Sequence, residues 1–511
     1  MSDNVRVIPK PSLSGLTPPE SVDMSDIKRK SVRGGAVTLV SQGAMAGIQL
    51  ISTAILARLL SPDDYGVMAM VVVVTNFAGL FREMGLSSAA IQKKGLTRAQ
   101  QSNLFWLNAG MGGTLTLMVA AGSPLVAMFY GRPELTSVTL ALSTTFIVSS
   151  LGTQHGAMLV RNMQFGRKAS AALGGALVGL VVSVIMAFKG FSYWSLVWGN
   201  VSGSVVTTLL LWVLSPFRPK CFTRRVGTRK MVNYGANITG FNFINFFQRN
   251  LDNILIGRFW GSGALGLYSR AYSLLMLPIT SIRNPISAVA FPALSRLQNE
   301  PDAFRSYYLK TTSLIALLSM PIAAFFLVAS KPIILLILGE QWLGVSPIFS
   351  SLAAAAFIQP ASGFAGSLLL SLGQGRRYLL CGTFNAAVIS VAFLIGVRWG
   401  AMGVATAYAI ANYVVLYPWL RWAYKDSPVS FSMFAKACSF PAIISIVGAL
   451  AAFVLRDHVE QFNVFLQLIA LASAFATGAI PLLLFSSVGK KYTRMILGIT
   501  SQFRRVERSK P

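Results

Sequence analysis

The chain has 511 residues, of which 54% are hydrophobic and only 12% are charged, and its formal net charge is +28. A soluble protein has about 25% charged residues, and here the charges lie between long apolar blocks. This composition excludes an ordinary soluble protein. It indicates an all-α integral membrane protein, because the repeated apolar blocks of about 20 residues match the hydrocarbon thickness of a bilayer.

The apolar blocks predict about 14 transmembrane helices. They cover residues 35–60, 65–91, 103–129, 134–158, 169–188, 191–214, 231–256, 264–290, 311–338, 344–371, 378–397, 401–420, 433–455 and 463–487. We predict six units: a disordered tail (1–34), a six-helix lobe (35–214), a basic linker (215–230), a second six-helix lobe (231–432), two additional helices (433–487) and a basic tail (488–511). The first tail has no apolar core of the signal-peptide type.

Lys and Arg are distributed unequally between the two sides of these spans. If the N-terminus is inside, the inner segments hold 32 of the 44 Lys and Arg, and the outer segments hold six. This bias predicts that both termini are cytoplasmic. It also accounts for the net charge, which would face anionic lipid headgroups, so nucleic acid is not an expected partner.

Two stretches of the chain resemble each other at an offset of 200 residues. ILARLLSPDDYGVM aligns with LIGRFWGSGALGLY, which pairs Arg58 with Arg258 and Gly66 with Gly266. Because six helices separate the two stretches, both lobes have the same orientation and form a parallel repeat about an axis along the membrane normal. Such lobes predict a solute path between them and alternating access by rocking.

A polar stripe runs along one face of the span 231–256. It contains Asn242, Asn245, Arg249 and Asp252, at spacings that share one helix face. Gln42, Gln49 and Ser52 form the matching face of the first span. A charge at the bilayer centre costs about 2.5–3.5 kcal/mol, so such residues normally face a bundle interior or a watery cavity. The alternative is interhelical bonding, with Arg249 and Asp252 as a structural pair.

Arginines outnumber carboxylates within the spans. The arginines assigned to an anion site are Arg82, Arg249, Arg270 and Arg283, and the carboxylates within spans are Glu83 and Asp252. This excess indicates an anionic ligand, and arginine suits phosphate because its planar fork bonds two oxygens at once. Glu83 and Asp252 are candidates for ion coupling or gating, and Glu83 could meet Arg283 across the pseudo-two-fold axis.

Several common chemistries lack support in the sequence. Three cysteines and two histidines have no metal or disulfide spacing, no phosphate-loop motif occurs, and no catalytic residue or cofactor is predicted. Asp63 and Asp64 in SPDDYG could suggest a glycosyltransferase, but a helix-capping turn is the preferred interpretation.

At ILARLLSPDDYGVMAM, FREMGLSSAAIQKK and RNLDNILIGRFWGSGALGLYSRAYSLLMLP the chain resembles Wzx-type polysaccharide transporters, close to the WzxC-like branch. These belong to the multidrug/oligosaccharidyl-lipid/polysaccharide exporter superfamily. The resemblance implies a flippase that moves undecaprenyl-diphosphate-linked oligosaccharide across the bacterial inner membrane for exopolysaccharide, capsule or lipopolysaccharide synthesis. It also implies two lobes around a cationic cavity, and a polysaccharide polymerase and chain-length or export proteins as possible partners.

On this hypothesis the four arginines attract the diphosphate, while sugar hydroxyls meet a second set of residues. That set is Gln42, Gln49, Asn242 and Asn245. The polyprenyl tail stays among the membrane lipids. Two alternatives remain: a drug or organic-cation exporter of the same superfamily, which would need an excess of buried carboxylates, and a membrane glycan polymerase or glycosyltransferase, which would need long outer loops.

Overall fold

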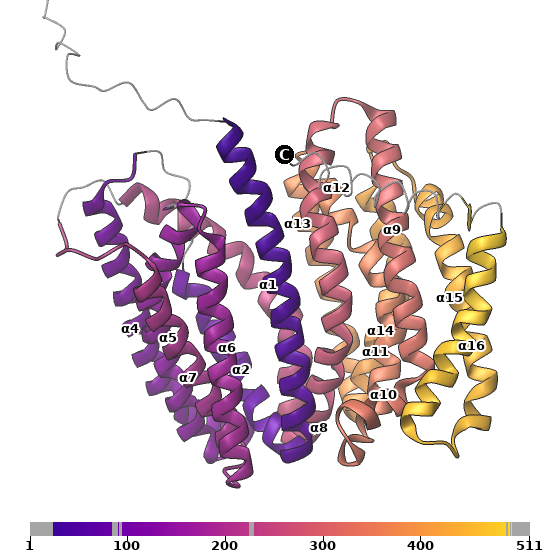
Figure 1. Cartoon of the computed structure of the whole chain (residues 1–511), viewed down its shortest axis with the longest axis horizontal. Coiled ribbons are helices and arrows are strands. Elements are labelled where there is room, and N and C mark those ends of the chain that lie inside the picture. The colour runs from indigo at the N-terminus through magenta and orange to yellow at the C-terminus, as the bar shows by residue number, and fades with distance from the viewer. Residues whose placement is uncertain are drawn as a thin grey trace, which may run out of the picture.

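The computed structural model consists of long helices that lie side by side (Figure 1). It describes residues 24–83, 90, 95–223, 229–486, 489–490 and 492, and the side chains at 24–34, 36, 82–83, 229–245, 247 and 248 are outside the description. In this part of the chain, twelve helical segments are long and apolar enough to cross a membrane. The prediction of an all-α integral membrane protein is therefore confirmed.

The first lobe contains six long helices in the described residues. They are α1 (Met24–Leu59), α2 (Pro62–Glu83), α4 (Arg98–Tyr130), α5 (Glu134–Arg161), α6 (Phe165–Phe188) and α7 (Trp194–Leu214). Within the lobe α4 packs on α5, α6 packs on α7, and α1 lies against α6. We call the end that carries Arg161 and Lys168 the basic end, and the end at residues 60–62 the opposite end.

The second lobe begins with α8, and two further helices follow it. Its elements are α8 (Arg229–Arg296), α9 (Pro301–Val328), α10 (Ser330–Ile337), η1 (Glu340–Trp342), α11 (Val345–Ser362), α12 (Ala365–Ser371), α13 (Gly375–Gly396), η2 (Val397–Trp399) and α14 (Gly400–Ala423). The additional helices are α15 (Phe431–Val459) and α16 (Val464–Phe485), and they pack on α9 and α10 at the right of Figure 1.

The long element α8 is a helical hairpin. The backbone at Gly261 has φ 79° and ψ −176°, which interrupts the helix and which glycine adopts without the steric cost of a Cβ atom. A Cβ atom at Gly257 would lie 3.2 Å from Leu265, so the chain folds back on itself here. Two candidate spans, Arg249–Arg296 and Gly375–Ala423, contain a helix reversal, and the sequence prediction also divides them there. The predicted span 311–338 differs from the structure, in which α9 runs from Pro301 to Val328 and the short helix α10 follows it.

Helix α1 begins earlier than the sequence interpretation placed it. The predicted disordered tail extended to residue 34, whereas α1 starts at Met24. The prediction marked the point where the apolar residues begin. A helix can extend beyond that point, because the residues from 24 to 33 include no Pro or Gly to stop it.

Glycines allow α6 and α7 to approach closely. A Cβ atom at Gly179 would lie 2.7 Å from the carbonyl oxygen of Gly199, and one at Gly175 would lie 2.6 Å from that of Gly203. Small residues four positions apart are a common basis of helix contacts in membranes, where the solvent gives helices no hydrophobic reason to associate. This crossing fixes one wall of the site described below.

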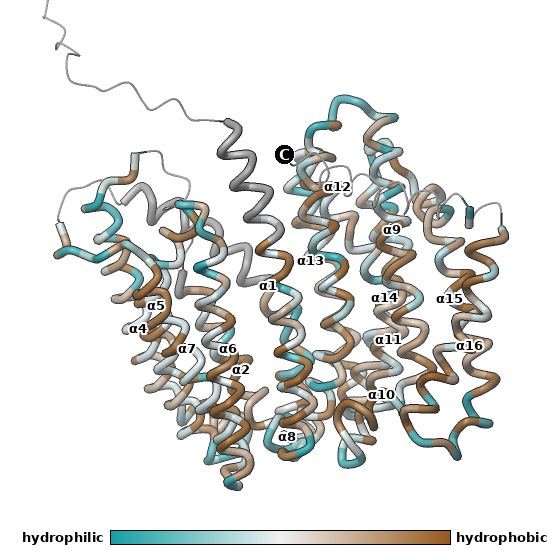
Figure 2. Tube along the Cα trace, in the orientation of Figure 1, coloured by the Kyte–Doolittle hydropathy of each residue, from teal (hydrophilic) through white to brown (hydrophobic). Residues whose placement is uncertain are grey.

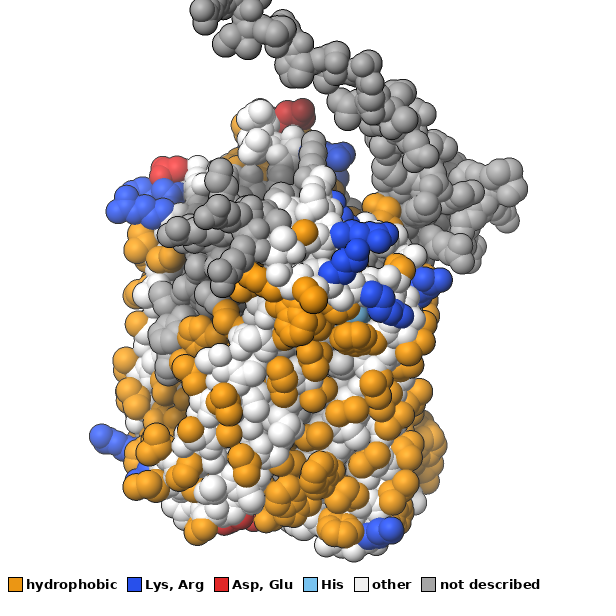
Figure 3. Space-filling model, turned by 90° about the vertical axis from the view of Figure 1, so that its left-hand side faces the viewer, with side chains coloured by type: hydrophobic (Ala, Val, Ile, Leu, Met, Phe, Trp, Pro, Cys, Tyr) orange, Lys and Arg blue, Asp and Glu red, His pale blue; other side chains and the backbone are white. Residues whose placement is uncertain are grey.

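The exterior of the bundle matches a membrane environment. Apolar residues run along the middle of the helices, and hydrophilic residues gather at their ends (Figure 2). Viewed from the side of the first lobe, most of the visible Lys and Arg side chains lie at the basic end (Figure 3). Many large apolar side chains are exposed, among them Leu117, Met128 and Phe188, and a bilayer would cover them.

The α6–α7 crossing provides a test of the fold. We expect Gly179→Val to lower the free energy of unfolding by about 1–3 kcal/mol, because the added atoms force the two backbones apart. Gly110→Val on α4 is the control, since a Cβ atom there meets no atom within 4 Å. Thermal unfolding of the purified variants measures the difference, and equal stability of the two would contradict the close crossing.

Candidate substrate cavity

A cavity of about 1000 Å³ lies in the first lobe, between α1, α2, α5, α6, α7 and both halves of α8. It extends from Val160 and Lys168 near the basic end to Tyr65 and Leu196 near the opposite end. The hairpin of α8 places second-lobe residues against this first-lobe wall. The cavity therefore contains side chains from both halves of the repeat.

Uncharged polar side chains make up much of the lining. They are Gln49, Ser52, Thr53, Asn76, Ser149, Thr153, Ser183, Asn200, Ser204, Thr207, Thr208, Asn250, Asn253 and Ser269. Lys168 and Arg270 are the cations among the described lining residues, and none of these residues is Asp or Glu. Hydroxyl and amide groups both donate and accept hydrogen bonds, so the cavity suits a polar ligand that carries negative charge.

Arg270 is a partly buried cation of the cavity lining. It lies on the second half of α8, and its guanidinium carbon is 4.5 Å from the centroid of the Tyr65 ring on α2. Its Nε atom is buried and has no hydrogen-bond partner among the described residues. A guanidinium group donates hydrogen bonds and accepts none. Arg270 thus has donor capacity available for an anion in the cavity.

The other predicted anion-site arginines do not line this cavity in the described part of the structure. Arg249 is exposed, although its neighbours Asn250 and Asn253 line the cavity. Arg283 lines a separate, smaller cavity in the second lobe. The side chain of Arg82 lies outside the described residues. Arg270 and Arg283 both lie on the second half of α8, but their separation of thirteen positions places them about 20 Å apart along the helix and on different faces, so they line different cavities.

The predicted sugar-contacting residues also have different locations. Gln49 lines the cavity, whereas Gln42 is exposed and is not among its lining residues. The side chains of Asn242 and Asn245 lie outside the described residues. Gln42 is two turns of α1 nearer the basic end than Gln49, beyond the described extent of the cavity along this helix.

Asp252 is buried and does not form an ion pair with Arg249, which was the alternative interpretation of the polar stripe. Its Oδ2 atom accepts a hydrogen bond of 2.8 Å from the Tyr268 hydroxyl, and its Oδ1 atom accepts one of 2.8 Å from the backbone N–H of Asn253. Both bonds lie within the α8 hairpin. The side chain of Glu83, the other predicted coupling residue, is outside the described part of the chain.

Sequence reasoning missed most of the polar lining. Asn76 interrupts the apolar run of α2, and Asn200 interrupts α7, so both carried a detectable signal. Lys168 was counted only as an inner-loop charge. Thr207 and Ser183 carried no signal, because single hydroxyl residues are frequent in membrane helices and bond to their own backbone.

The two lobes meet at the opposite end through contacts that the repeat duplicates. A Cβ atom at Gly66 would overlap the backbone of Ser262, and one at Gly266 would overlap the carbonyl of Pro62. The two contacts are equivalent under the repeat offset of 200 residues: Gly66 corresponds to Gly266, and Pro62 corresponds to Ser262. This reciprocity is the contact expected of a pseudo-two-fold axis, and it involves the glycines that the sequence repeat had paired.

A second reciprocal contact surrounds the first. The Trp342 indole donates a hydrogen bond of 2.7 Å to the carbonyl of Ala57, and the ring of Tyr130 lies 2.9 Å from the Cβ position of Gly257. Positions 57 and 257 are again repeat mates. Trp342 is fully buried and also packs edge-to-face with the Tyr65 ring. Each lobe thus covers the same position of the other lobe with an aromatic ring.

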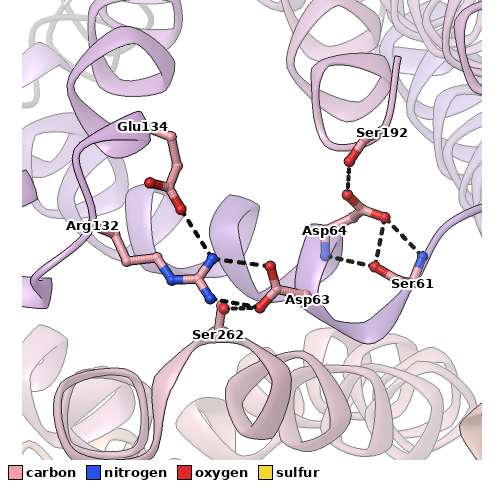
Figure 4. Close-up of polar contacts among 7 residues, drawn as sticks. All are labelled: Ser61, Asp63, Asp64, Arg132, Glu134, Ser192 and Ser262. Carbon is pink, nitrogen blue, oxygen red and sulfur yellow. Dashed lines mark hydrogen bonds and ion pairs between the residues drawn. The ribbon is translucent and has the colours of Figure 1, made fainter. Parts of the chain in front are cut away.

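Polar contacts from the SPDDYG stretch (residues 61–66) lie beside these glycine and aromatic contacts (Figure 4). We call the whole set of contacts between the lobes at the opposite end the closure. Arg132 donates to Asp63 at 2.9 and 3.0 Å and to Glu134 at 3.0 Å, and the Ser262 hydroxyl of the second lobe also donates to Asp63. The hydrogen bond to Asp63 is the main reason why the pKa of Arg132 is raised above its ordinary value. Asp63 therefore links the two lobes.

Asp64 has the capping role predicted for this turn. It accepts hydrogen bonds from the Ser61 backbone N–H at 2.8 Å and from the Ser61 hydroxyl at 2.7 Å, just before α2 begins. The Ser192 hydroxyl donates to the same carboxylate (Figure 4). These contacts are a structural use of the acidic pair, and they differ from the metal or nucleophile role that a glycosyltransferase would need.

The chain matches a known protein family. The family model described as "Polysaccharide biosynthesis protein" matches residues 55–347, which is more than half of the chain. The chain belongs to this polysaccharide biosynthesis family. This membership confirms the Wzx-type resemblance, and with the fold it makes the chain a multi-pass membrane transporter rather than an enzyme.

Curated relatives of the polysaccharide biosynthesis family cover most of the chain. It is 26% identical over 462 residues to the teichuronic acid biosynthesis protein TuaB of Bacillus subtilis, covering 89% of this chain and 95% of TuaB. It is 23% identical over 395 residues to the lipopolysaccharide biosynthesis protein WzxC of Escherichia coli, covering 76% of this chain and 80% of WzxC.

A solved structure supports the fold of this family member. The lipid II flippase MurJ in an inward closed conformation superposes with a TM-score of 0.69 at 14% identity, covering 87% of this chain and 97% of MurJ. At this identity the similarity concerns the fold alone.

The reciprocal glycine contact predicts how the opposite end opens. We expect Gly66→Val to separate the lobes there, because the added side chain has no room against the Ser262 backbone. In a chain lacking Cys221, Cys381 and Cys438, a Leu196→Cys probe in the cavity should then react faster with a membrane-impermeant maleimide added from that side.

The matched control is Gly79→Val, because Gly79 is on the same helix and a Cβ atom there meets no atom within 4 Å. The probe should react at its original rate in this variant. Equal labelling of the Gly66→Val and Gly79→Val chains would contradict the assignment of Gly66 to the closure.

Proposed function

We propose that this transporter is a flippase for undecaprenyl-diphosphate-linked oligosaccharide in the bacterial inner membrane. It would deliver repeat units for exopolysaccharide, capsule or lipopolysaccharide synthesis. The observation that carries the proposal is the composition of the first-lobe cavity, which combines Arg270 with many neutral polar side chains and has no described carboxylate. Membership of the polysaccharide biosynthesis family supports the substrate class.

The lining fits the two parts of such a headgroup. Arg270 can bond two oxygens of one phosphate, because its guanidinium is planar and its Nε has no other partner. Asn200, Asn250 and Asn253 can bond sugar hydroxyls, since an amide both donates and accepts. Neutral amides can bond the hydroxyls of different sugars. The attraction between Arg270 and the phosphate would be the same whichever sugar the lipid carries.

The proposed orientation places the basic end in the cytoplasm. The excess of Lys and Arg at that end supports both cytoplasmic termini through the positive-inside rule. The contacts at Gly66 and Gly266 then close the outer side, and the headgroup enters from the inner leaflet while its polyprenyl tail stays in lipid. Rocking of the lobes would open the outer side and release the headgroup there.

The direction of transport needs a source of free energy. One charge that crosses the full membrane potential is worth about 2.3 kcal/mol per 100 mV, so movement of an anion outward can be driven electrically. Among the described carboxylates within the spans, we propose Asp252 for ion coupling. Binding of a proton or a cation to Asp252 would change its hydrogen bond with Tyr268. Glu83 remains the second proposed coupling residue.

The lining also distinguishes this proposal from a drug or organic-cation exporter. Such a substrate needs a negative partner inside the bundle, where an unpaired charge is costly. The described lining residues contain no carboxylate, whereas they contain two cations. A polysaccharide polymerase and chain-length or export proteins are the partners proposed to receive the product.

Arg270 provides the direct test. We expect Arg270→Gln to weaken headgroup binding by about 1.5–3 kcal/mol, the range for hydrogen bonds to charged groups, which is about tenfold or more in affinity. Arg270→Lys should retain part of the activity, because the charge remains but the bidentate geometry is lost. Translocation of a fluorescent undecaprenyl-diphosphate saccharide in proteoliposomes measures the effect at matched protein levels.

The control for this experiment is Arg305→Gln. Arg305 is at the basic end, and its ion pair with Asp302 lies within one turn of α9, away from the cavity. We expect normal translocation in this variant. If Arg270→Gln and Arg305→Gln translocate at the rate of the natural chain, the proposed role of Arg270 in substrate binding is wrong.

A further inference from the structure

A second cavity, of about 250 Å³, lies in the second lobe near its basic end. It is bounded by the second half of α8, the α11–α12 junction, α13 and α14. Arg283 is the cation among its described lining residues, and none of them is Asp or Glu. The remaining polar lining comes from Ser367, Thr383, Asn385 and Trp419, together with Tyr378.

Two donor groups in this cavity are poorly satisfied. Nη2 of Arg283 donates to the Gly363 carbonyl at 3.5 Å, which is longer than the usual N–H···O distance of about 2.7–3.2 Å. Nε1 of Trp419 is buried and has no partner among the described residues, although a buried indole N–H usually finds one. Both groups can only donate. Their natural partner is a ligand rich in acceptor oxygens and negatively charged.

The repeat relates this cavity to the basic end of the larger one. Eight pairs of lining residues are separated by 210 positions, among them Gly156 and Gly366, Val160 and Leu370, Lys168 and Tyr378, Ala172 and Gly382, and Gly175 and Asn385. The second cavity thus occupies the place in the second lobe that the inner part of the first cavity occupies in the first lobe. Tyr378 stands where Lys168 supplies a cation, and Arg283 supplies one from α8 instead.

The rim of the second cavity is apolar and accessible. Leu370 and Leu379 line the cavity and are also exposed, and Leu380 and Phe384 are exposed beside them on α13. In a membrane-spanning bundle these side chains face hydrocarbon. An occupant that places an anion near Arg283 while it covers this rim therefore has both a phosphate and a lipid chain.

We propose that the second-lobe cavity is a binding site for the phosphate-bearing headgroup of a lipid, separate from the first-lobe cavity. The phosphate lies against Arg283 and Trp419, and the lipid chain leaves over Leu370 and Leu379. The lipid carrier of the glycan and an anionic phospholipid such as phosphatidylglycerol share this chemistry. The site does not depend on the proposed flippase activity, because it is defined by lipid binding alone.

Binding to the purified full-length chain tests the site. Native mass spectrometry would follow titration with undecaprenyl diphosphate or phosphatidylglycerol, with undecaprenol as the phosphate-free control. The Arg270→Gln chain serves as the background, because it weakens the first-lobe site. We expect Arg283→Gln to lower the affinity for the remaining phosphate lipid about tenfold or more, as loss of a charge-assisted contact does, and Arg283→Lys to restore part of it.

Two further variants separate binding from folding. Gly382→Leu should also abolish binding, because a Cβ atom there meets nothing within 4 Å and the longer side chain fills the cavity. Gly375→Leu and Arg376→Gln are the matched controls on α13, as neither residue lines the cavity. Both control chains should bind as the background chain does.

The outcomes decide both the site and its occupant. Loss of phosphatidylglycerol binding in Arg283→Gln and Gly382→Leu identifies a phospholipid site, and loss of undecaprenyl diphosphate binding alone identifies a site for the glycan carrier. Either result supports the proposal. Unchanged binding of both lipids in Gly382→Leu, with the chain folded, overturns it whether or not the protein translocates saccharide.

Discussion

The crossing of α2 with the second half of α8 is the contact on which the arrangement of the two lobes depends. At Gly66 and Gly266 each helix lies against the backbone of the other, and a side chain at either position would separate them. Trp342 and Tyr130 form a second reciprocal pair of contacts beside it, with Ala57 and Gly257 respectively. These contacts join the lobes at the opposite end, while the first-lobe cavity extends toward the basic end.

The same interface must open if the lobes rock. The Arg132–Asp63 pair at its edge is partly exposed, with exposed fractions of 34% and 49%, and such pairs contribute only about 0–1 kcal/mol. Helix packing is thus the main barrier to opening.

The cavity and the closure share residues, which suggests how binding and lobe movement are connected. Tyr65 directly precedes Gly66 in α2. Its ring packs edge-to-face with Trp342, and the Arg270 guanidinium lies over its face. Tyr65 belongs to the first lobe, whereas Trp342 and Arg270 belong to the second. Separation of the lobes at Gly66 would therefore also remove the aromatic partner of Arg270. In the proposed mechanism, the movement that opens the opposite end would therefore also change the anion site, as alternating access requires.

Sequence reasoning predicted the fold more completely than the site. Hydropathy located the spans, and the pairing of Gly66 with Gly266 identified the repeat whose reciprocal contact the structure contains. The sequence groups Arg249, Arg270 and Arg283 in one anion site, whereas of these three only Arg270 lines the first-lobe cavity. Periodicity gives the face of a helix on which a residue lies, and it does not tell what packs against that face. The reversal at Gly261 directs the two halves of α8 to different neighbours. Thr207 and Ser183 were missed because their role depends on the space left between glycine-rich helices, which no local pattern records.

A structure of the chain bound to an undecaprenyl-diphosphate saccharide would test the central claim most directly. The account predicts diphosphate density within hydrogen-bonding distance of the Arg270 guanidinium and sugar density beside Asn200 and Asn253, with the prenyl chain outside the helices. Headgroup density that lies outside the first-lobe cavity, with Arg270 still stacked on Tyr65 and no contact to phosphate, would contradict it.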